Sequence, residues 1–129
     1  MTGEEGRCAA SAADWSDTAA EAVRALNHAT LPAAGGMQGP ADAYSVLSGL
    51  VLLAGRLPQA LAQLQGFLDV ECEAGRVAVI DGDFAGDPVA AVSACAHWLT
   101  LAADAADSAR HALEQAHATL TWAASRTLH

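Results

Sequence analysis

The residues best suited to chemistry form a histidine–glutamate cluster near the C-terminus, His111-x-x-Glu114-x-x-His117. Glu and His three residues apart lie on one side of a helix, and pairs with this spacing hold metal ions in the cores of some helical bundles. Dimetal sites of that kind also need carboxylates from facing helices, and the facing segment has none between Asp42 and Asp69. The three residues are kept as metal candidates, with a surface cluster as the competing interpretation.

The other reactive side chains form no recognisable catalytic set. Asp81, Asp83 and Asp87 resemble part of a calcium-binding loop, but the glutamate that such a loop carries at its twelfth position is missing. The sequence has no serine-nucleophile motif, no phosphate-binding glycine loop and no Lys. His97 and Trp98, together with the histidine cluster, define one alternative: a small-molecule- or metal-binding bundle, possibly an enzyme. We expect no cofactor and favour a protein that is not an enzyme.

Charge and cysteine content restrict the classes of partner. The 129 residues carry a formal net charge of -9, and all six basic residues are Arg. This balance repels phosphate backbones and anionic lipid, so we expect no direct nucleic-acid binding; an acidic mimic that inhibits a nucleic-acid-binding partner is a further alternative. The three cysteines form no C-x-x-C pair, no signal sequence is recognisable, and the apolar run Val46–Leu57 is too short to cross a bilayer. We therefore expect a cytoplasmic protein without a membrane segment.

The stretch from Ala41 to Ala74 has the pattern of a helix that packs lengthwise against another helix. Its apolar residues alternate strictly in steps of four and three, which keeps them on one face of a slightly supercoiled helix. Pro58 interrupts the pattern without changing its phase, which predicts a kink; a complete break at this residue is the alternative. The main seam comprises Ala43, Leu47, Leu50, Ala54, Leu57, Leu61, Leu64 and Leu68, and a second stripe comprises Val46, Leu53, Ala60 and Phe67.

A second long helix is predicted after Asp87-Pro88, because Asp caps helices and Pro is favoured at their first position. Its seam contains two polar residues, Arg110 and His117. Either the seam is partly exposed there, or Arg110 pairs with Asp107 or Asp104 on its own helix, or the two residues set the register or partner choice of a dimer. A ladder of alanines beside the seam predicts a close approach of two helices. The seam comprises Val92, Ala96, Leu99, Ala103, Ala106, Arg110, Leu113, His117, Leu120 and Ala124, and the ladder Ala102, Ala105, Ala109, Ala112 and Ala116.

The elements assemble into an all-α fold. Residues 1–12 are predicted to be a loose tail, and residues 13–129 a single helical domain. Within this domain a short helix over Ala13–His28, started by Ser11 and Asp14, precedes a long antiparallel helical hairpin with a kink near Pro58. Because both long helices carry two apolar stripes, we expect two hairpins to form a four-helix core on dimerisation.

The leading hypothesis is a non-enzymatic helical interaction or adaptor protein that acts as a homodimer and docks another protein of unknown identity. The hypothesis rests on the two apolar seams, which indicate packing against other helices, and on the lack of a recognisable catalytic set in the sequence. The predicted interface residues are Leu47, Leu50, Leu57, Leu61, Leu64, Leu68, Leu99, Arg110, Leu113, His117 and Leu120.

Three short segments, Ala25–Thr30, Ala41–Tyr44 and Leu53–Gln59, carry a resemblance to a known group of proteins. The chain resembles small uncharacterised helical-hairpin proteins of actinobacteria, which are often encoded in conjugative or integrated elements. The resemblance extends from about Leu26 to Ala124. It implies a helical fold and carries no catalytic assignment.

Overall fold

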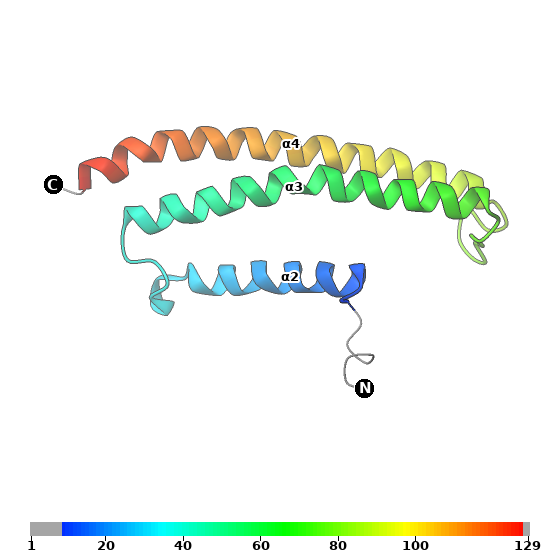
Figure 1. Ribbon diagram of the computed structural model, residues 1–129, viewed down its shortest axis with the longest axis horizontal. Helices are drawn as coiled ribbons and strands as arrows, with labels where there is room; N and C mark the ends of the chain where they lie inside the picture. The colour runs from blue at the N-terminus through cyan, green and yellow to red at the C-terminus, as the bar shows by residue number, and fades with distance from the viewer. Residues whose placement is uncertain (1–8, 128–129) are drawn as a thin grey trace. The chain divides into compact units, whose positions relative to one another are not determined.

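A computed structural model describes residues 9–127, and the side chains of residues 9–121. Within this part the chain contains three α-helices, one short 3-10 helix and no strand, so the predicted all-α fold is confirmed (Figure 1). The residues separate into two compact units, one ending at Gly39 and one beginning at Pro40. Each unit has its own helices and is described by itself.

The first unit contains helix α2, Ala12–Ala29, and the 3-10 helix η1, Pro32–Ala34. Ser11 caps α2: its hydroxyl accepts a hydrogen bond from the Asp14 amide, while the Asp14 carboxylate accepts one from the Ser11 amide. This reciprocal capping box satisfies two amides that the first turn of a helix leaves unpaired. The helix matches the segment predicted from the sequence. Of the predicted tail, residues 1–8 lie outside the described residues.

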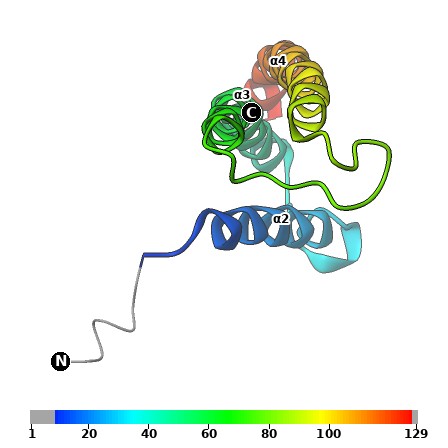
Figure 2. The same ribbon diagram turned by 90° about the vertical axis from the view of Figure 1, so that its right-hand side faces the viewer.

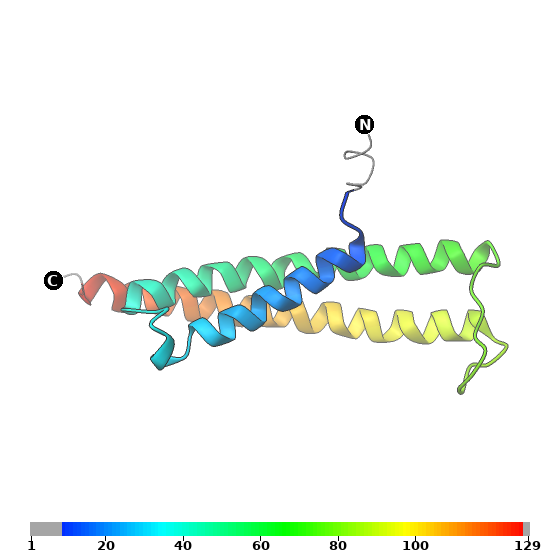
Figure 3. The same cartoon turned by 90° about the horizontal axis from the view of Figure 1, so that it is seen from below.

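The second unit is a hairpin of two long helices, α3 (Pro40–Glu73) and α4 (Pro88–Thr127). Figures 2 and 3 show them side by side and antiparallel, joined by a loop at one end. Both helices begin at a proline, where the missing amide costs no intrahelical hydrogen bond. In α4 the Asp87 carboxylate accepts a hydrogen bond from the Ala90 amide at 3.1 Å and acts as the predicted cap. The long antiparallel hairpin is confirmed.

Helix α3 continues through Pro58 from Pro40 to Glu73, so the alternative of a broken helix is excluded. Pro58 cannot donate the amide hydrogen bond to Ala54 that an ordinary residue would donate. The residue is half-buried, and the turns on both sides of it pack along α4. Packing of the flanking turns therefore offsets the local loss, because most helical stability in proteins comes from the buried face.

The loop between the long helices is closed by glycine and by an ion pair. Gly75 has a φ of 75°, the left-handed conformation that commonly ends a helix and that residues with a side chain avoid. The next residue, Arg76, turns back and donates a hydrogen bond from Nε to Glu71 at 2.8 Å. Residues 76–80 form no regular secondary structure.

The hairpin buries very little of itself. Among the described residues only Ala54, Val92 and Ala106 are buried, and two of these are alanines. Small side chains allow a close approach of two helices but remove little apolar area from water. A large part of the apolar surface is therefore exposed, and it is this surface that points to function.

Candidate interaction surfaces

The contact between α3 and α4 follows the predicted seam on α4. Every seam residue whose side chain is described is buried or half-buried, from Val92 to Leu120, while the side chain of Ala124 lies outside the described part. The alanine ladder beside it does not line the contact as predicted. Its residues Ala102, Ala105, Ala109, Ala112 and Ala116 are exposed, so the close approach is made by seam residues such as Ala103 and Ala106.

On α3, six of the eight predicted seam residues are buried or half-buried, including Ala43 and Leu50 beside the residues that face α4. Leu47, Ala54, Leu61 and Leu68 face α4 as expected and are buried or half-buried. Between these four residues, the contact uses the residue that follows each predicted seam position in the sequence. The helix is therefore rotated slightly about its axis relative to the predicted orientation. These half-buried residues are Tyr44, Val51, Pro58, Gln65 and Cys72, whereas Leu57 and Leu64 are 43% and 49% exposed.

The predicted interface residues thus divide into two sets. One set lies between the two helices of the hairpin and comprises Leu47, Leu61, Leu68, Leu99, Arg110, Leu113, His117 and Leu120. The other set lies on the flank of α3 beside this contact and comprises Leu50, Leu57 and Leu64. The second set is turned away from α4, so it is available to another molecule.

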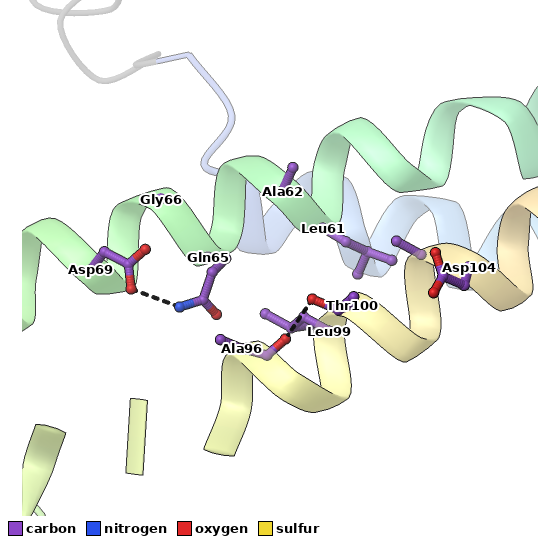
Figure 4. A pocket seen from close by; sticks show the side chains of 10 residues that line it. Leu61, Ala62, Gln65, Gly66, Asp69, Ala96, Leu99, Thr100 and Asp104 are labelled. Atoms are coloured by element: carbon purple, nitrogen blue, oxygen red, sulfur yellow. Dashed lines mark hydrogen bonds between the residues drawn. The ribbon is translucent and has the colours of Figure 1, made fainter. Parts of the chain in front are cut away.

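A groove marks one side of the hairpin. It has a volume of about 350 Å³, and Figure 4 shows Leu61 and Gln65 extending into it from α3 toward α4. An adjoining hollow of about 450 Å³ continues it toward the loop and shares Gln65, Asp69 and Ala96. We call both together the acidic groove. Its residues are Leu61, Ala62, Gln65, Gly66, Asp69, Cys72, Glu73, Val89, Val92, Ser93, Ala96, Leu99, Thr100, Ala103 and Asp104.

The charged groups of the acidic groove are all carboxylates. Asp69, Glu73 and Asp104 line it, and no Arg does. Gln65 donates a hydrogen bond from Nε2 to Asp69 at 2.7 Å, whereas its Oε1 atom is buried and has no hydrogen-bond partner within the described chain. Thr100 donates to the Ala96 carbonyl of its own helix at 2.9 Å. The groove therefore combines an apolar floor with unneutralised negative charge.

The opposite side of the hairpin is apolar. Successive residues of a helix point in directions about 100° apart around its axis. The side of each helix that lies across the contact from the groove, its far flank, is therefore formed by a different set of residues. Because α3 and α4 are antiparallel, their two far flanks belong to the same side of the pair. We call this side the apolar face. It comprises Val46, Leu50, Leu53, Leu57, Ala60, Leu64 and Phe67 of α3, and Trp98, Ala102, Ala105, Ala109, Ala112 and Ala116 of α4.

The apolar face has mostly large side chains on α3 and, except for Trp98, alanines on α4. Phe67 is 61% exposed and Trp98 67% exposed. In α3 the only charged residue between Asp42 and Asp69 is Arg56, which lies at the outer edge of this face. Its α3 residues repeat in steps of four and three, the spacing of a seam that receives another helix lengthwise.

Arg110 lies near the middle of α4 and pairs with carboxylates on its own helix. It donates from Nη2 to Asp107 at 3.0 Å and from Nη1 to Glu114 at 2.9 Å. The hydrogen bond to Asp107 and the nearby charge of Glu114 raise the pKa of Arg110 above its ordinary value. The aliphatic part of the side chain lies over Gly55 of α3: a Cβ atom at that glycine would be 3.1 Å from Arg110 Cδ. Of the two interpretations offered for Arg110, pairing within its own helix describes the hairpin.

His117 stacks on Tyr44 across the hairpin. The ring centroids are 4.0 Å apart with an interplanar angle of 21°, an arrangement of two flat rings that adds to simple burial. The Nε2 atom of His117 is buried and has no hydrogen-bond partner among the described residues. This contact joins the first turns of α3 to the C-terminal part of α4.

The metal candidates take separate roles. His111 is exposed, Glu114 is bound to Arg110, and His117 stacks on Tyr44. Within the residues that the structure describes, no three His, Cys, Asp or Glu side chains gather into a group that could hold a metal ion.

The remaining candidate residues have local partners. His97 contacts its neighbour Trp98 edge to face, with ring centroids 5.3 Å apart, and both side chains are exposed. In the loop, Asp81 accepts a hydrogen bond from the Gly82 amide, and Asp87 caps α4. Residues 97 and 98 therefore lie on the surface, and the two aspartates stabilise a turn and a helix start.

Sequence reasoning missed the acidic groove and Tyr44. The groove needs small residues opposite each other on two helices, and Gly66 with Ala96 and Ala103 supplies them. Each of these residues is unremarkable in its own helix, so only the pairing of α3 with α4 makes the hollow. The signal for Tyr44 was the single tyrosine of the chain, one residue after the predicted seam position Ala43.

Both long helices also satisfy a length and composition test for membrane crossing. An 18-residue window within Pro40–Glu73 has a mean hydropathy of 1.4 and one within Pro88–Thr121 a mean hydropathy of 1.3, and 6% and 11% of these windows are buried. Helix α3 extends well beyond the short apolar run Val46–Leu57 noted in the sequence. The exposed apolar surface is therefore suited by composition to protein or lipid.

Comparison of the chain with protein families, curated proteins and solved structures finds no match.

Proposed function

We propose that the protein is a non-enzymatic helical interaction protein of the cytoplasm that acts as a homodimer. In this proposal the apolar faces of two hairpins pack together and form a four-helix core. The observation that carries it is the apolar face itself, which is two helices wide and shows the seam spacing of a helix that receives a neighbour. Large side chains on α3 and alanines on α4 offer complementary shapes to a second copy related by a twofold axis.

The distribution of charge supports a second copy as the occupant. Two chains of net charge -9 repel each other unless their charged surfaces point apart. Asp69, Asp104 and Asp107 lie on the side of the acidic groove, away from the apolar face. Packing through the apolar face keeps these carboxylates in water and avoids burying unpaired charge.

The size of the face supports the same occupant. The segment from Val46 to Phe67 is about 30 Å long at 1.5 Å per residue. Two helices about 10 Å apart give a face about 20 Å wide, so each copy contributes on the order of 600 Å² in projection. Standard stable interfaces bury about 800 Å² of accessible surface per partner. The projected area of this face approaches that value, and its accessible area is larger because side chains protrude from it.

The register of the hairpin favours protein over lipid as the cover. Tyr44 lies beside His117 and Gly55 beside Arg110, so the segment between Asp42 and Arg56, which has no charged residue, runs along the charged part of α4. A hairpin that crosses a bilayer at that depth would carry Asp107, Arg110 and Glu114 into it. Charged residues at the centre of a membrane helix cost about 2.5–3.5 kcal/mol each on insertion scales.

The test is the mass of the protein in solution, measured by sedimentation equilibrium at micromolar concentration. We expect about twice the chain mass of 13.1 kDa for the native sequence. Leu57→Glu with Leu64→Glu puts two charges on the apolar face and should give a folded monomer. Ser48→Glu with Gln59→Glu adds the same charge at exposed positions of α3 outside this face and should remain a dimer.

Two results would refute the proposal. One is a native protein that stays monomeric at about 10 µM, a concentration at which a dimer with a Kd of about 1 µM would be largely formed. The other is co-flotation of the native protein with neutral phosphatidylcholine vesicles, abolished by Leu57→Glu with Leu64→Glu, which would assign the apolar face to lipid. Far-UV circular dichroism of each variant confirms that helix content is retained.

A further inference from the structure

The acidic groove lies on the side of the hairpin that the proposed dimer leaves open. We propose that it docks an amphipathic helix of a partner protein, with Arg or Lys residues beside an apolar ridge. This inference rests on the proposed function, because it supplies the chemistry of the partner that an interaction protein would bind. It does not require the dimer, since no residue of the apolar face lines the groove.

The shape of the groove fits a helix. Its α3 residues run from Leu61 to Glu73, which is about 18 Å at 1.5 Å per residue, or about three helical turns. The acidic groove lies along the line where α3 and α4 meet, so its floor is straight and is made by side chains of both helices. Leu61 and Leu99 with Ala96 and Ala103 give this floor an apolar surface on which a ridge of leucines can lie.

The charges of the groove select a basic partner. Asp69, Glu73 and Asp104 are spread along its whole length, and no Arg in the groove neutralises them. The buried Gln65 Oε1 atom adds an acceptor that lacks a donor within the described chain. Guanidinium and ammonium groups are charged donors that satisfy carboxylates and amide oxygens together. A second copy of this acidic chain offers the wrong charge for the same groove.

Direct binding can be measured with designed peptides and the full chain. The probe is a fluorescein-labelled helical peptide of about 18 residues, with Leu at every third and fourth position and Arg on both flanks of the Leu ridge. The matched peptide has Glu in place of each Arg. We expect saturable binding of the Arg peptide by fluorescence anisotropy, weakening with added salt, and no binding of the Glu peptide.

Variants of the protein distinguish peptide binding in the groove from nonspecific electrostatic attraction of the basic peptide to an acidic protein. Asp69→Asn with Asp104→Asn should weaken binding by about tenfold or more, because two charged partners are removed from the groove. Asp81→Asn with Asp83→Asn removes the same charge from the loop, outside the groove, and should change the Kd by less than about twofold. Equal weakening by both pairs, or equal binding of the Glu peptide, would overturn the proposal.

Filling the groove gives an independent check on shape. A Cβ atom at Gly66 would meet no side chain and no other helix within 4 Å, so Gly66→Leu starts a side chain from open space at the groove. This variant should lose peptide binding while its melting temperature rises, because Gly is a poor helix former. Unchanged binding by Gly66→Leu would contradict docking in the groove. Sedimentation of the same samples reports the dimer separately, so failure of docking and failure of dimerisation are distinguishable.

Discussion

The contact of Arg110 with Gly55 makes a quantitative prediction about glycine substitutions in α3. Gly55 and Gly66 both lie inside this helix and both are exposed. A Cβ atom at Gly66 would meet nothing within 4 Å, whereas one at Gly55 would lie 3.1 Å from Arg110 Cδ and 3.9 Å from Arg110 Cγ. Replacing each glycine by Ala therefore adds the same methyl group to the same helix, with and without a neighbour.

The expected magnitudes follow from helix propensity and contact distance. Ala is more favourable than Gly in a helix interior by about 0.8–1.0 kcal/mol, so Gly66→Ala should raise the free energy of unfolding by about that amount. Carbon atoms in contact prefer about 3.5–4.0 Å, so at Gly55 the Arg110 side chain must move away by a few tenths of an ångström. Arg110 is held by Asp107 and Glu114 and yields only by loosening those hydrogen bonds. Gly55→Ala should therefore gain clearly less than Gly66→Ala.

Urea denaturation at one fixed protein concentration measures both changes, and a gain of 1 kcal/mol corresponds to about 4–8 °C in melting temperature for a unit of this size. Shortening Arg110 to Ala removes the obstacle, so in that background the two glycine substitutions should give equal gains. The reasoning is refuted if Gly55→Ala stabilises the native sequence as much as Gly66→Ala. It is equally refuted if the Arg110→Ala background leaves the difference between them unchanged.

Two further predictions concern the contact between α3 and α4. His117→Phe keeps the ring against Tyr44 and removes the unpartnered Nε2 atom, so thermal melting should show a free energy of unfolding higher by on the order of 1 kcal/mol. His117→Ala loses the ring and should lower the free energy of unfolding. Pro58→Ala restores the amide hydrogen bond to Ala54 but removes ring contacts from a half-buried site, so urea denaturation should show a net gain of about 1–2 kcal/mol; a loss would mean that the proline ring is required for the packing of α3 on α4.

The sequence predicted α4 more accurately than α3 for a physical reason. On α4 the charged residues Asp104, Asp107 and Glu114 leave only one seam that includes large apolar side chains, interrupted at Arg110 and His117, so the face toward α3 is unambiguous. On α3 large apolar residues occupy neighbouring positions, as Leu50 and Val51 do. Either could face α4, and the periodicity alone does not decide between them. Packing against a particular partner helix made that choice.

The surfaces were harder to predict than the helices because they depend on two helices at once. The second apolar stripe of α3 was recognised from Val46, Leu53, Ala60 and Phe67, and it does lie exposed or half-buried beside the hairpin contact. The acidic groove was not recognised, since Asp69 and Asp104 lie in different helices and meet only through the register of the hairpin. Spacing within one segment carries no information about that register.

The stack of Tyr44 on His117 also bears on the order in which the hairpin forms. Glu73 and Pro88, which flank the loop, are close in sequence, whereas the stacked rings are the most widely separated of the named contacts along the chain. Because closing a longer segment costs more chain entropy, pairing should begin near the loop and propagate outward. Substitutions that remove a ring, such as His117→Ala, should then accelerate unfolding and leave the folding rate nearly unchanged, so the aromatic pair slows the opening of the hairpin at the end away from the loop.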